Sequence, residues 1–391
     1  MKYSFDEITD RRNTDSLKWS VGENELPMWV ADMDFKTAPE ITESILKRAR
    51  HGIFGYNIVP SEWYDAYKRH WKDRYGVEIQ SEELIFCTGV VPAVSSIVRK
   101  LTTPAENVLL LTPVYNIFYN SVLNNGRNVL ECPLLYNGKT YEIDFSDLEK
   151  KLSAPQTTMM ILCNPHNPVG KIWSREELSR IGDLCKQHHV LVVSDEIHCD
   201  LTESGKTYTP FFSVSDACRF GSITCVAPTK SFNLAGLQTA AVIVPNENIR
   251  NKVNRGLNTD EVAEPNCFAV LAAVAAYTKG EEWLDELRIY LDRNRAFASD
   301  YIRKEISDLY PVKAEATYLL WLDCRKIENE SADLCRYLRE TTGLCLCDGR
   351  EYGSGGEGFL RMNLACPKSV LDDGLARLKS GILAYRTRFS V

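Results

Sequence analysis

Residues Ser174–His198 have the sequence SREELSRIGDLCKQHHVLVVSDEIH, in which a helical pattern is followed directly by a strand pattern. Ser174 precedes the helical part, and Glu177 lies three residues later, as in a capping box. Val190–Val193 is apolar without interruption, which is typical of a strand covered on both faces. A helix followed by such a strand predicts a unit of an α/β fold.

Further apolar runs of strand length lie on either side of this unit. They are Leu84–Cys87, Val108–Leu111, Met159–Cys163 and Ile223–Ala227. Amphipathic stretches separate several of these runs, and alternation of strands and helices builds a mainly parallel sheet with helices on both faces. The fold class predicted for the central part of the chain is therefore α/β, with a doubly wound sheet.

The C-terminal part has a different pattern, in which helices alternate with fewer strands. The expected elements are a charged helix from Glu281 to about Lys304, a strand at Thr317–Asp323 (TYLLWLD), a helix near Ser331–Thr341, a glycine-rich loop at Gly353–Gly358, a strand at Phe359–Ala365 (FLRMNLA) and a last helix. This pattern predicts a smaller α+β domain over residues 278–391 and a large domain over residues 36–277. We expect the N-terminal segment, residues 1–35, to pack with the small domain.

Composition and charge exclude several classes of protein. The chain has 391 residues, enough for two or three domains at ~100–200 residues each. Its net charge is −7 and it contains no long basic run, so nucleic acid is not expected as a partner. The thirteen cysteines include no C-x-x-C pair. We expect them to be reduced and buried, and we predict no metal site.

Neither membrane insertion nor export is expected. The longest apolar stretch, Phe268–Tyr277, is about half of the ~20 residues that a bilayer span needs, and it predicts a buried helix. The N-terminal sequence MKYSFDEITD lacks the apolar core of a secretory signal. The sequence therefore predicts a cytoplasmic protein.

Four segments that follow predicted strands contain groups capable of chemistry. They are Thr88–Pro92 (TGVVP), Asn164–Gly170 (NPHNPVG), Ser194–His198 (SDEIH) and Ala227–Gly236 (APTKSFNLAG). In open α/β sheets, ligands bind beyond the carboxyl ends of the strands, so these segments are the candidates for a site.

Each segment has a functional and a purely structural interpretation. The amides that follow Gly89 at a helix start suit a phosphate, although a plain strand-to-helix turn has the same pattern. The NPHNPVG segment presents polar amides but could be a bare turn. Asp195 is costly to bury without a cationic partner, and a solvent-facing loop carboxylate is the alternative. Lys230 has apolar neighbours that favour a partly desolvated amine able to form a Schiff base, whereas most lysines are solvated surface charges.

Taken together and in this order, the motifs G-V-V-P, T-P-x-Y, N-P-x-N-P-x-G, S-D-E, T-K-S-F-N-L-A-G and R-x-N resemble those of the fold-type I enzymes that use pyridoxal 5′-phosphate (PLP). A narrower match, over nearly the whole chain, is to the branch of C–S lyases of the MalY/PatB kind, which contains cystathionine β-lyase and cysteine desulfhydrase. The segments that match this branch are MWVADMDF (Met28–Phe35), FGYNIVP (Phe54–Pro60), GVVPAV (Gly89–Val94), CNPHNPVGK (Cys163–Lys171) and SDEIH (Ser194–His198).

The resemblance implies a role for each site residue around the ring of the cofactor. Lys230 holds PLP covalently and then acts as the base at Cα. Asp195 pairs with the pyridinium nitrogen, which compensates its buried charge. Asn167 hydrogen-bonds the 3-oxygen of the ring, and Tyr115 stacks on the ring face.

The resemblance also implies residues for the phosphate and the substrate. The phosphate binds at the helix start formed by Gly89, Val90 and Val91, helped by Tyr56 from a second subunit, which implies a homodimer. Arg361 clamps the α-carboxylate of the amino-acid substrate; without the resemblance, an arginine paired with an acid on a half-exposed strand would be the preferred interpretation. Trp29 in MWVADMDF lines the side-chain end of the pocket, with a surface turn as the alternative.

Three positions depart from the commoner aminotransferase pattern. His198 stands where a tyrosine is usual, so control of the 3-oxygen rests more on Asn167. Ala227 replaces a hydroxyl residue and leaves Thr229 as a nearby substitute. Gln238 stands where many relatives have a phosphate-binding arginine, so neutral donors and the helix end would hold the phosphate.

The function that the resemblance implies is a PLP-dependent C–S β-lyase that releases a thiol, pyruvate and ammonia. A PLP-dependent aminotransferase of class I/II is the alternative, because the same fold can return the proton to the cofactor instead of expelling a thiolate. An alternative of another class is a PLP-binding protein whose main role is to contact a regulator.

Overall fold

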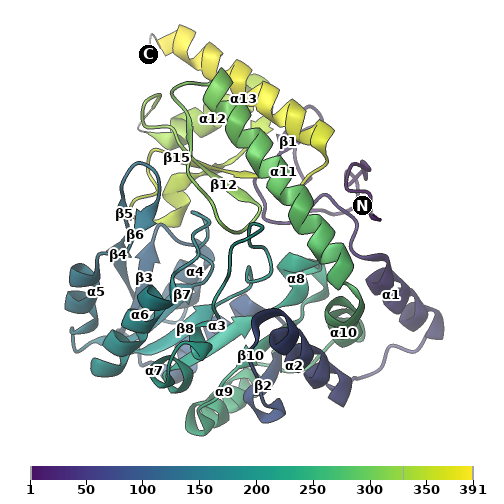
Figure 1. Ribbon diagram of the computed structural model, residues 1–391, viewed down its shortest axis with the longest axis vertical. Helices are drawn as coiled ribbons and strands as arrows, with labels where there is room; N and C mark the ends of the chain where they lie inside the picture. Colours follow the sequence, from purple (N-terminus) through teal and green to yellow (C-terminus); the bar gives the residue numbers. More distant parts are fainter. Residues whose placement is uncertain (1, 329, 390–391) are drawn as a thin grey trace.

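The computed structural model describes residues 2–328 and 330–389, and its centre is a seven-stranded sheet (Figure 1). In spatial order the strands are β2 (Leu84–Cys87), β10 (Ala240–Ile243), β9 (Ser222–Val226), β8 (Leu191–Asp195), β7 (Thr157–Cys163), β3 (Asn107–Thr112) and β4 (Asn128–Pro133). The neighbours from β9 to β4 are parallel, and β10 runs antiparallel to both β2 and β9. The predicted doubly wound, mainly parallel α/β sheet is confirmed.

Helices cover both faces of this sheet, and its central strands are mostly apolar. On one face, α3 (Val90–Leu101), α4 (Ile117–Leu123) and α9 (Glu247–Thr259) pack against strand residues that include Val108 and Leu110. On the other face, α5 (Phe145–Leu152), α6 (Arg175–Gln187) and α7 (Asp216–Phe220) pack against the alternate residues, Leu109 and Leu111. Side chains of a strand point alternately to its two faces, so both sets are buried.

The helix predicted at Ser174–His189 is α6, and its start has the predicted cap. The Ser174 hydroxyl accepts a hydrogen bond from the Glu177 amide at 3.1 Å, and the Glu177 carboxylate accepts one from the Ser174 amide at 2.8 Å. This reciprocal pair satisfies amides that the first helical turn leaves free. It thereby fixes the point at which the chain turns from the NPHNPVG loop into the helix.

A third group of helices covers the β2 end of the sheet, on the same face as α5, α6 and α7. It consists of α1 (Pro39–His51), α2 (Ser61–Tyr75) and α10 (Ala269–Lys279), which share a core with Leu84 and Phe86 of β2. The stretch predicted as a buried helix at Phe268–Tyr277 corresponds to α10. The short helix α8 (Pro228–Ser231) follows β9 and packs near α10.

The C-terminal part forms a second, antiparallel sheet in the upper half of Figure 1. Its strands, in order, are β11 (Tyr310–Pro311), β12 (Leu319–Asp323), β15 (Phe359–Asn363) and β14 (Cys347–Asp348), and its helices are α11 (Glu281–Glu305), α12 (Ser331–Thr342) and α13 (Lys368–Phe389). The N-terminal strand β1 (Leu26–Pro27) pairs with β13 (Leu344–Cys345), so the start of the chain lies against this part. Domain boundaries near residues 35 and 277 stay a prediction.

Two further features of the described residues bear on the expectations from composition. All thirteen cysteines are free, and eleven of them are buried. None of the helices within residues 2–328 and 330–389 is long and apolar enough to cross a membrane, and these residues contain no cluster suited to a metal ion.

Candidate active site

The carboxyl ends of β7, β8 and β9 and the start of α3 enclose a cavity of about 300 Å³. Nine of the predicted site residues line it: Gly89, Val90, Val91, Tyr115, Asn167, Asp195, His198, Thr229 and Lys230. They come from five separate segments of the chain, which the crossover connections of the sheet bring to one edge. Tyr56, Trp29 and Arg361 are not among the residues that line the cavity.

Lys230 lies in α8, directly after β9, and its amine points toward the N-terminal segment. The Nζ atom donates a hydrogen bond to the carbonyl oxygen of Ala31 at 2.5 Å. Burial, and then the positive charge of Arg361, lower the pKa of Lys230 to about 8. A lysine with this pKa is largely neutral slightly above pH 8, and the neutral amine is the nucleophilic form.

Asp195 is the last residue of β8 and is 4% exposed. Burial raises the pKa of its carboxyl group to about 7, against the opposing effects of a hydrogen bond from the Ile197 amide at 3.1 Å and of the nearby Lys230. A carboxylate can accept several hydrogen bonds, so Asp195 retains capacity for a cationic partner in the cavity. This burial argues against the alternative of a solvent-facing loop residue.

Tyr115, Asn167 and His198 occupy the walls of the cavity. Burial raises the pKa of Tyr115, and the charge of Asp195 adds to the effect. Burial, with the charges of Lys230 and Arg361, lowers the pKa of His198 to about 3, so its imidazole is neutral. Among the described residues, no partner contacts the buried Nδ1 atom of His198. His198 therefore adds a neutral imidazole to the cavity wall.

Helix α3 begins at Val90, after Gly89 in an extended conformation, and its first residues line the cavity. The first amides of a helix have no partner within the helix, and the helix dipole adds positive potential there. A Cβ atom at position 89 would lie 3.1 Å from Cδ of Pro92. Glycine at this position therefore keeps the helix start open to an anion.

Arg361 lies on β15 of the small sheet and reaches toward the cavity from the opposite side. It is 4% exposed, and its Nη1 atom donates to Oδ1 of Asn167 at 3.4 Å. Its Nη2 atom donates to the carbonyl oxygen of Trp29 at 2.9 Å, and its guanidinium lies 5.0 Å from the ring centre of Tyr352. Its buried Nε atom has no partner among the described residues. Arg361 is therefore buried, which argues against the alternative interpretation that it is a structural arginine on a half-exposed strand.

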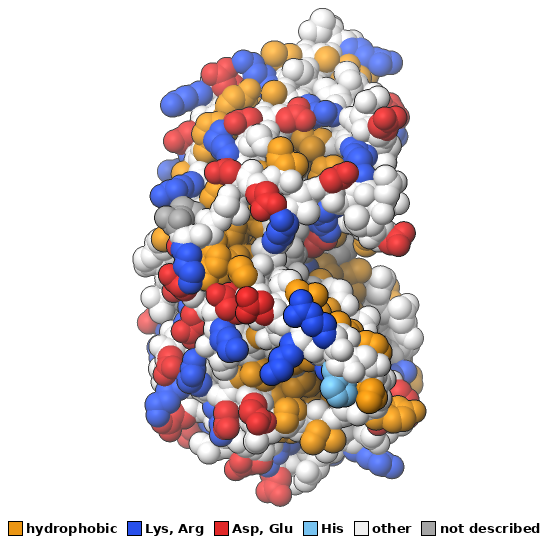
Figure 2. All heavy atoms as spheres, turned by 90° about the vertical axis from the view of Figure 1, so that its right-hand side faces the viewer, with side chains coloured by type: hydrophobic (Ala, Val, Ile, Leu, Met, Phe, Trp, Pro, Cys, Tyr) orange, Lys and Arg blue, Asp and Glu red, His pale blue; other side chains and the backbone are white. Residues whose placement is uncertain are grey.

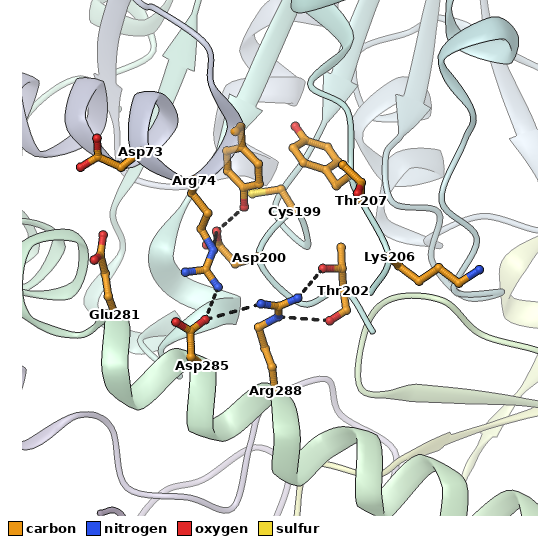
Figure 3. A pocket seen from close by; sticks show the side chains of 12 residues that line it. Asp73, Arg74, Cys199, Asp200, Thr202, Lys206, Thr207, Glu281, Asp285 and Arg288 are labelled. Atoms are coloured by element: carbon orange, nitrogen blue, oxygen red, sulfur yellow. Dashed lines mark hydrogen bonds and ion pairs between the residues drawn. The ribbon is translucent and has the colours of Figure 1, made fainter. Parts of the chain in front are cut away.

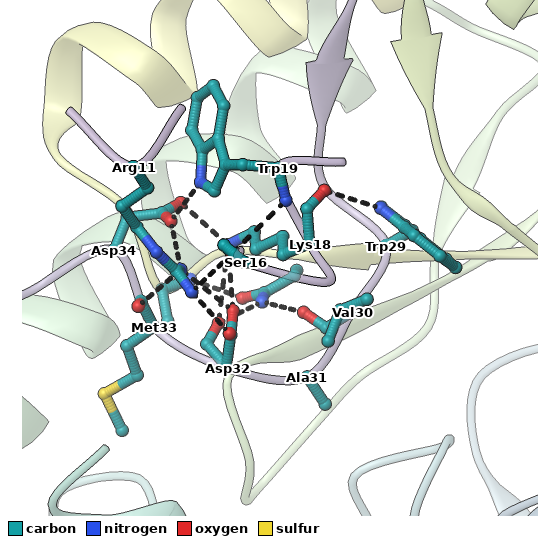
Figure 4. A network of polar contacts seen from close by, with 12 residues as sticks. Arg11, Ser16, Lys18, Trp19, Trp29, Val30, Ala31, Asp32, Met33 and Asp34 are labelled. Atoms are coloured by element: carbon teal, nitrogen blue, oxygen red, sulfur yellow. Dashed lines mark hydrogen bonds and ion pairs between the residues drawn. The ribbon is translucent and has the colours of Figure 1, made fainter. Parts of the chain in front are cut away.

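The N-terminal segment closes the site through its backbone rather than through Trp29. The indole nitrogen of Trp29 donates to the Lys18 carbonyl at 3.1 Å, and the ring points away from Ala31 (Figure 4). The carbonyl of Trp29 contacts Arg361 and that of Ala31 contacts Lys230, so two site cations bind backbone oxygens of one turn.

A network of charges fixes this turn (Figure 4). Lys18, which is 1% exposed, pairs with Asp34 at 2.7 Å, and Arg11 pairs with Asp34 at 2.8 Å and with Asp32 at 2.7 Å. The amide of Asn363 also donates to the carbonyls of Val30 and Asp32, each at 2.7 Å. The acidic pair of the MWVADMDF segment therefore anchors the segment and does not line the cavity.

Ala31, Thr88, Cys163 and Ile197 also line the cavity, although none of them was predicted as a site residue. All four lie within the candidate segments or the matching motifs, but only Thr88 and Ile197 directly adjoin predicted residues, Gly89 and His198. Tyr56 lies elsewhere: it is fully exposed in the loop between α1 and α2.

Comparison with known proteins places the chain in a family. The sequence profile described as "Aminotransferase class I and II" matches residues 15–378, which is most of the chain. This protein belongs to the class I and II aminotransferase family. Its architecture, with the large sheet, the smaller C-terminal sheet and a lysine after β9, is that of the fold-type I members of this family.

Within the family, the chain is similar to proteins named for C–S bond cleavage. It is 44% identical to "Cystathionine beta-lyase PatB" of Bacillus subtilis, over 97% of this chain and 100% of that one. It is 33% identical to "Protein MalY" of Escherichia coli, over 98% and 100% of the two chains. The solved structure of cystalysin from Treponema denticola, which contains a pyridoxal 5′-phosphate cofactor, superimposes with a TM-score of 0.95 at 33% identity, over 98% and 100% of the chains.

Proposed function

We propose that this protein is a PLP-dependent C–S β-lyase that cleaves the Cβ–S bond of cystathionine, cysteine or a similar amino acid and releases a thiol, pyruvate and ammonia. The observation that supports this most directly is the pair Lys230 and Asp195 in one cavity, at the strand ends of a chain whose full-length relatives include a cystathionine β-lyase. Lyase chemistry at this site requires the cofactor, so the cavity must suit PLP.

The residues of the cavity fit this cofactor group by group. Lys230 supplies an amine with a lowered pKa for covalent attachment to the aldehyde. Asp195 would supply a buried carboxylate for a protonated ring nitrogen, and the start of α3 would supply amides for the phosphate. Asn167 and the neutral imidazole of His198 line the same cavity and would hold the ring oxygen, while Tyr115 would supply an aromatic face.

When bound, PLP supplies an electron-withdrawing ring that stabilises negative charge at the substrate Cα atom. The chain's own residues then direct the reaction. Arg361 binds the α-carboxylate and orients the amino acid, while Lys230 takes the proton from Cα. Asp195 keeps the ring nitrogen protonated. Departure of the thiolate from Cβ, with no proton delivered to the cofactor, distinguishes elimination from amino-group transfer.

The protein acts as a homodimer in this proposal, and Tyr56 helps bind the phosphate in the partner's site. Tyr56 is fully exposed, and Ile53, Phe54 and Ile58 beside it are 67%, 58% and 81% exposed. A groove of about 680 Å³ adjoins them between α1, α10 and the loop that contains Ile58. Figure 2 shows hydrophobic side chains among Lys and Arg side chains on the lower half of this face. An apolar surface of this kind is typical of a protein interface.

We also place the protein in the cytoplasm, because its thirteen cysteines are free and a reducing compartment keeps thiols in that form.

Product analysis tests the proposed reaction. Purified holoenzyme with L-cystathionine or L-cysteine should release pyruvate and ammonia in equal amounts without any added 2-oxo acid. Aminotransferase activity is the second candidate, favoured by the description of the family profile that matches the chain. Transfer of the amino group to an added 2-oxo acid, at a rate above that of pyruvate release in the same preparation, would assign the protein to that reaction instead.

A further inference from the structure

Asp200 is a buried carboxylate outside the candidate active site. It is 1% exposed and lies in the segment after β8, five residues beyond Asp195. A carboxylate in the protein interior is costly unless several donors contact it. The identity and position of these donors therefore indicate what the charge stabilises.

Donors from two elements contact Asp200. From α2, His70 Nε2 lies 2.8 Å from Oδ1, and the Tyr75 hydroxyl donates to the same oxygen. From α8, the Ser231 hydroxyl donates to Oδ2 at 2.7 Å. Burial opposes the ionised form of Asp200, but the neighbouring His70 and Arg74 outweigh it and hold the pKa below its usual range. The carboxylate is therefore ionised, which strengthens each of these hydrogen bonds.

The Ser231 bond is the one that bears on the active site, because Ser231 directly follows Lys230. Helix α8 has four residues, and Ser231 is its last. Asp200 and His198 belong to one segment, and Ser231 and Lys230 belong to the other. The Asp200–Ser231 bond therefore joins the two segments that present His198 and Lys230 to the cavity, and neither Asp200 nor Ser231 lines that cavity itself.

A second cavity, of about 380 Å³, lies on the outer side of Asp200 (Figure 3). Arg74 extends along it and pairs with Asp285 of α11 at 2.6 Å, while its Nε atom lies 3.8 Å from Oδ1 of Asp200. Arg288 of α11 donates to the Thr202 carbonyl at 3.1 Å. The Arg74 and Arg288 contacts connect α2 and the segment that contains Asp200 and Thr202 to α11, so they hold Asp200 in position.

We propose that Asp200 is a positioning residue for Lys230, acting through its hydrogen bond with the Ser231 hydroxyl. The braced carboxylate fixes the end of α8, and α8 in turn fixes the direction of the Lys230 side chain relative to Asp195 and His198. This rests on the proposed function in one respect, namely that Lys230 holds the cofactor and moves the Cα proton. Proton transfer is sensitive to position, since displacements of about 1 Å can cost up to ~100-fold in rate.

Two matched variants test this role. Ser231→Ala removes the hydroxyl that links Asp200 to α8, and Tyr75→Phe removes a hydroxyl that contacts the same carboxylate but belongs to α2. Both remove one donor from Asp200, so a merely structural carboxylate predicts similar effects on thermal stability and none on the chemistry. Each holoenzyme is measured for the pH midpoint of the cofactor absorbance, for kcat and KM with L-cystathionine, and for Tm.

We expect Ser231→Ala to shift the absorbance midpoint by about half a pH unit. It should also lower kcat about tenfold, with KM changed less than about twofold. Tyr75→Phe should lower Tm with the midpoint and kcat close to those of the wild type. Equal midpoints in wild type and Ser231→Ala, or equal shifts in both variants, would overturn the inference.

If Ser231→Ala is too unstable to purify, Ser231→Cys provides the same test, because a thiol is nearly the same size but a weak donor. It should shift the midpoint in the same direction, and a wild-type midpoint in this variant would also overturn the inference. Wild-type protein that carries no cofactor on Lys230 would instead contradict the proposed function, so the two failures are distinguishable.

Discussion

Lys230 and Asp195 are groups of opposite charge, and their pKa values lie closer together in the protein than in water. Burial lowers that of Lys230 to about 8 and raises that of Asp195 to about 7. Desolvation disfavours the charged form of each group. The attraction between the two opposite charges counteracts this effect only in part. Near neutral pH, small changes in the surroundings of either group therefore change its protonation.

The first prediction concerns attachment of the cofactor at Lys230. Purified protein should be yellow, and borohydride should reduce the cofactor onto one peptide, which contains Lys230. Lys230→Ala should lose this labelling completely, because the variant has no amine in α8. Lys171→Ala is the matched control, since Lys171 pairs with Glu177 outside the cavity. Labelling of the wild-type protein at another lysine, or undiminished labelling of the Lys230→Ala protein, would contradict the assignment.

The second prediction concerns pH. The rate at which cofactor-free protein captures PLP should rise with pH to a midpoint near 8, because the neutral amine reacts and the pKa of Lys230 is lowered to about 8. After burial, the Arg361 charge is the next largest cause of this lowering. Arg361→Met should therefore move the midpoint upward. Stopped-flow absorbance gives the midpoints, and a downward shift in Arg361→Met would refute this account.

The third prediction concerns binding of the substrate carboxylate by Arg361. Arg361→Ala should lower kcat/KM for L-cystathionine by the equivalent of ~2–4 kcal/mol, because a charge-assisted pair to the carboxylate is lost. Arg325→Ala is the control, since Arg325 lies after β12, is partly exposed and pairs with Asp323. Borohydride labelling at Lys230 should persist in both variants. A kcat/KM for Arg361→Ala equal to that of Arg325→Ala would remove Arg361 from the carboxylate site.

The site residues that could be predicted are those whose chemical type is unusual for their position. Lys230 and Asp195 directly follow buried strands, where charged side chains need a reason, and the structure brings both to one cavity. The carbonyl of Ala31 could not be predicted, because any residue has a carbonyl and its partner is 199 positions away in the chain. The same holds for the Asp200–Ser231 bond, which depends on how the segment after β8 packs against α8.

At the scale of elements, strands with continuous apolar runs were predictable and others were not. β4 is an edge strand whose six residues include only one that is buried, so it lacks the expected run. β10 is fully buried but has four residues, two of them alanines, and it forms no βαβ unit because it is antiparallel to both neighbours. The hydrophobic periodicity of a sequence does not indicate whether neighbouring strands run parallel or antiparallel.

The N-terminal segment is the element whose role the structure changes most. Its single short strand, β1, has two residues, and charged side chains provide much of its attachment. The Lys18–Asp34 pair is buried and the two Arg11 pairs are partly buried, in contrast to the many exposed ion pairs of the helices. Their loss should therefore affect both stability and the turn that contacts Lys230 and Arg361.

The fourth prediction follows from this contrast. Lys18 and Asp34 pair at 2.7 Å with side chains 1% and 6% exposed, and Arg11 still pairs with Asp34 at 2.8 Å when Lys18 is removed. Lys18→Met should therefore lower the free energy of unfolding by ~1.5–3 kcal/mol, as for the loss of a hydrogen bond to a charged group, measured by urea denaturation. Lys379→Met, which breaks the exposed pair with Glu305, should cost ~0–1 kcal/mol. Equal costs for the two variants would show that the N-terminal pair contributes no more than a surface pair.

At the scale of the whole molecule, one chain encloses the ring-binding part of the cavity but leaves Tyr56 in solvent. The loop between α1 and α2 exposes several large apolar side chains in a row, and burial in a partner would remove this surface from water. Gln238, which is uncharged, lines the cavity. If the phosphate binds beside it, as we propose, an additional donor from a second chain would strengthen that binding. Assembly and cofactor retention should therefore be coupled.

The fifth prediction tests this coupling. Ile58→Asp places a charge at the centre of the exposed apolar loop, so it should convert a dimer to a monomer in sedimentation and speed the loss of PLP on dilution. Tyr56→Phe leaves the apolar surface intact, so it should remain dimeric and lose PLP faster than the wild type because one hydroxyl donor is absent. Leu17→Asp is the control, because Leu17 is 70% exposed but lies in the N-terminal segment away from this loop. The two loop variants separate assembly from the contribution of the Tyr56 hydroxyl, since only Ile58→Asp should change the mass of the particle measured by sedimentation.

A wild-type monomer with full activity at low concentration would reject the homodimer. Unchanged PLP retention in Tyr56→Phe would reject only the contact between Tyr56 and the phosphate.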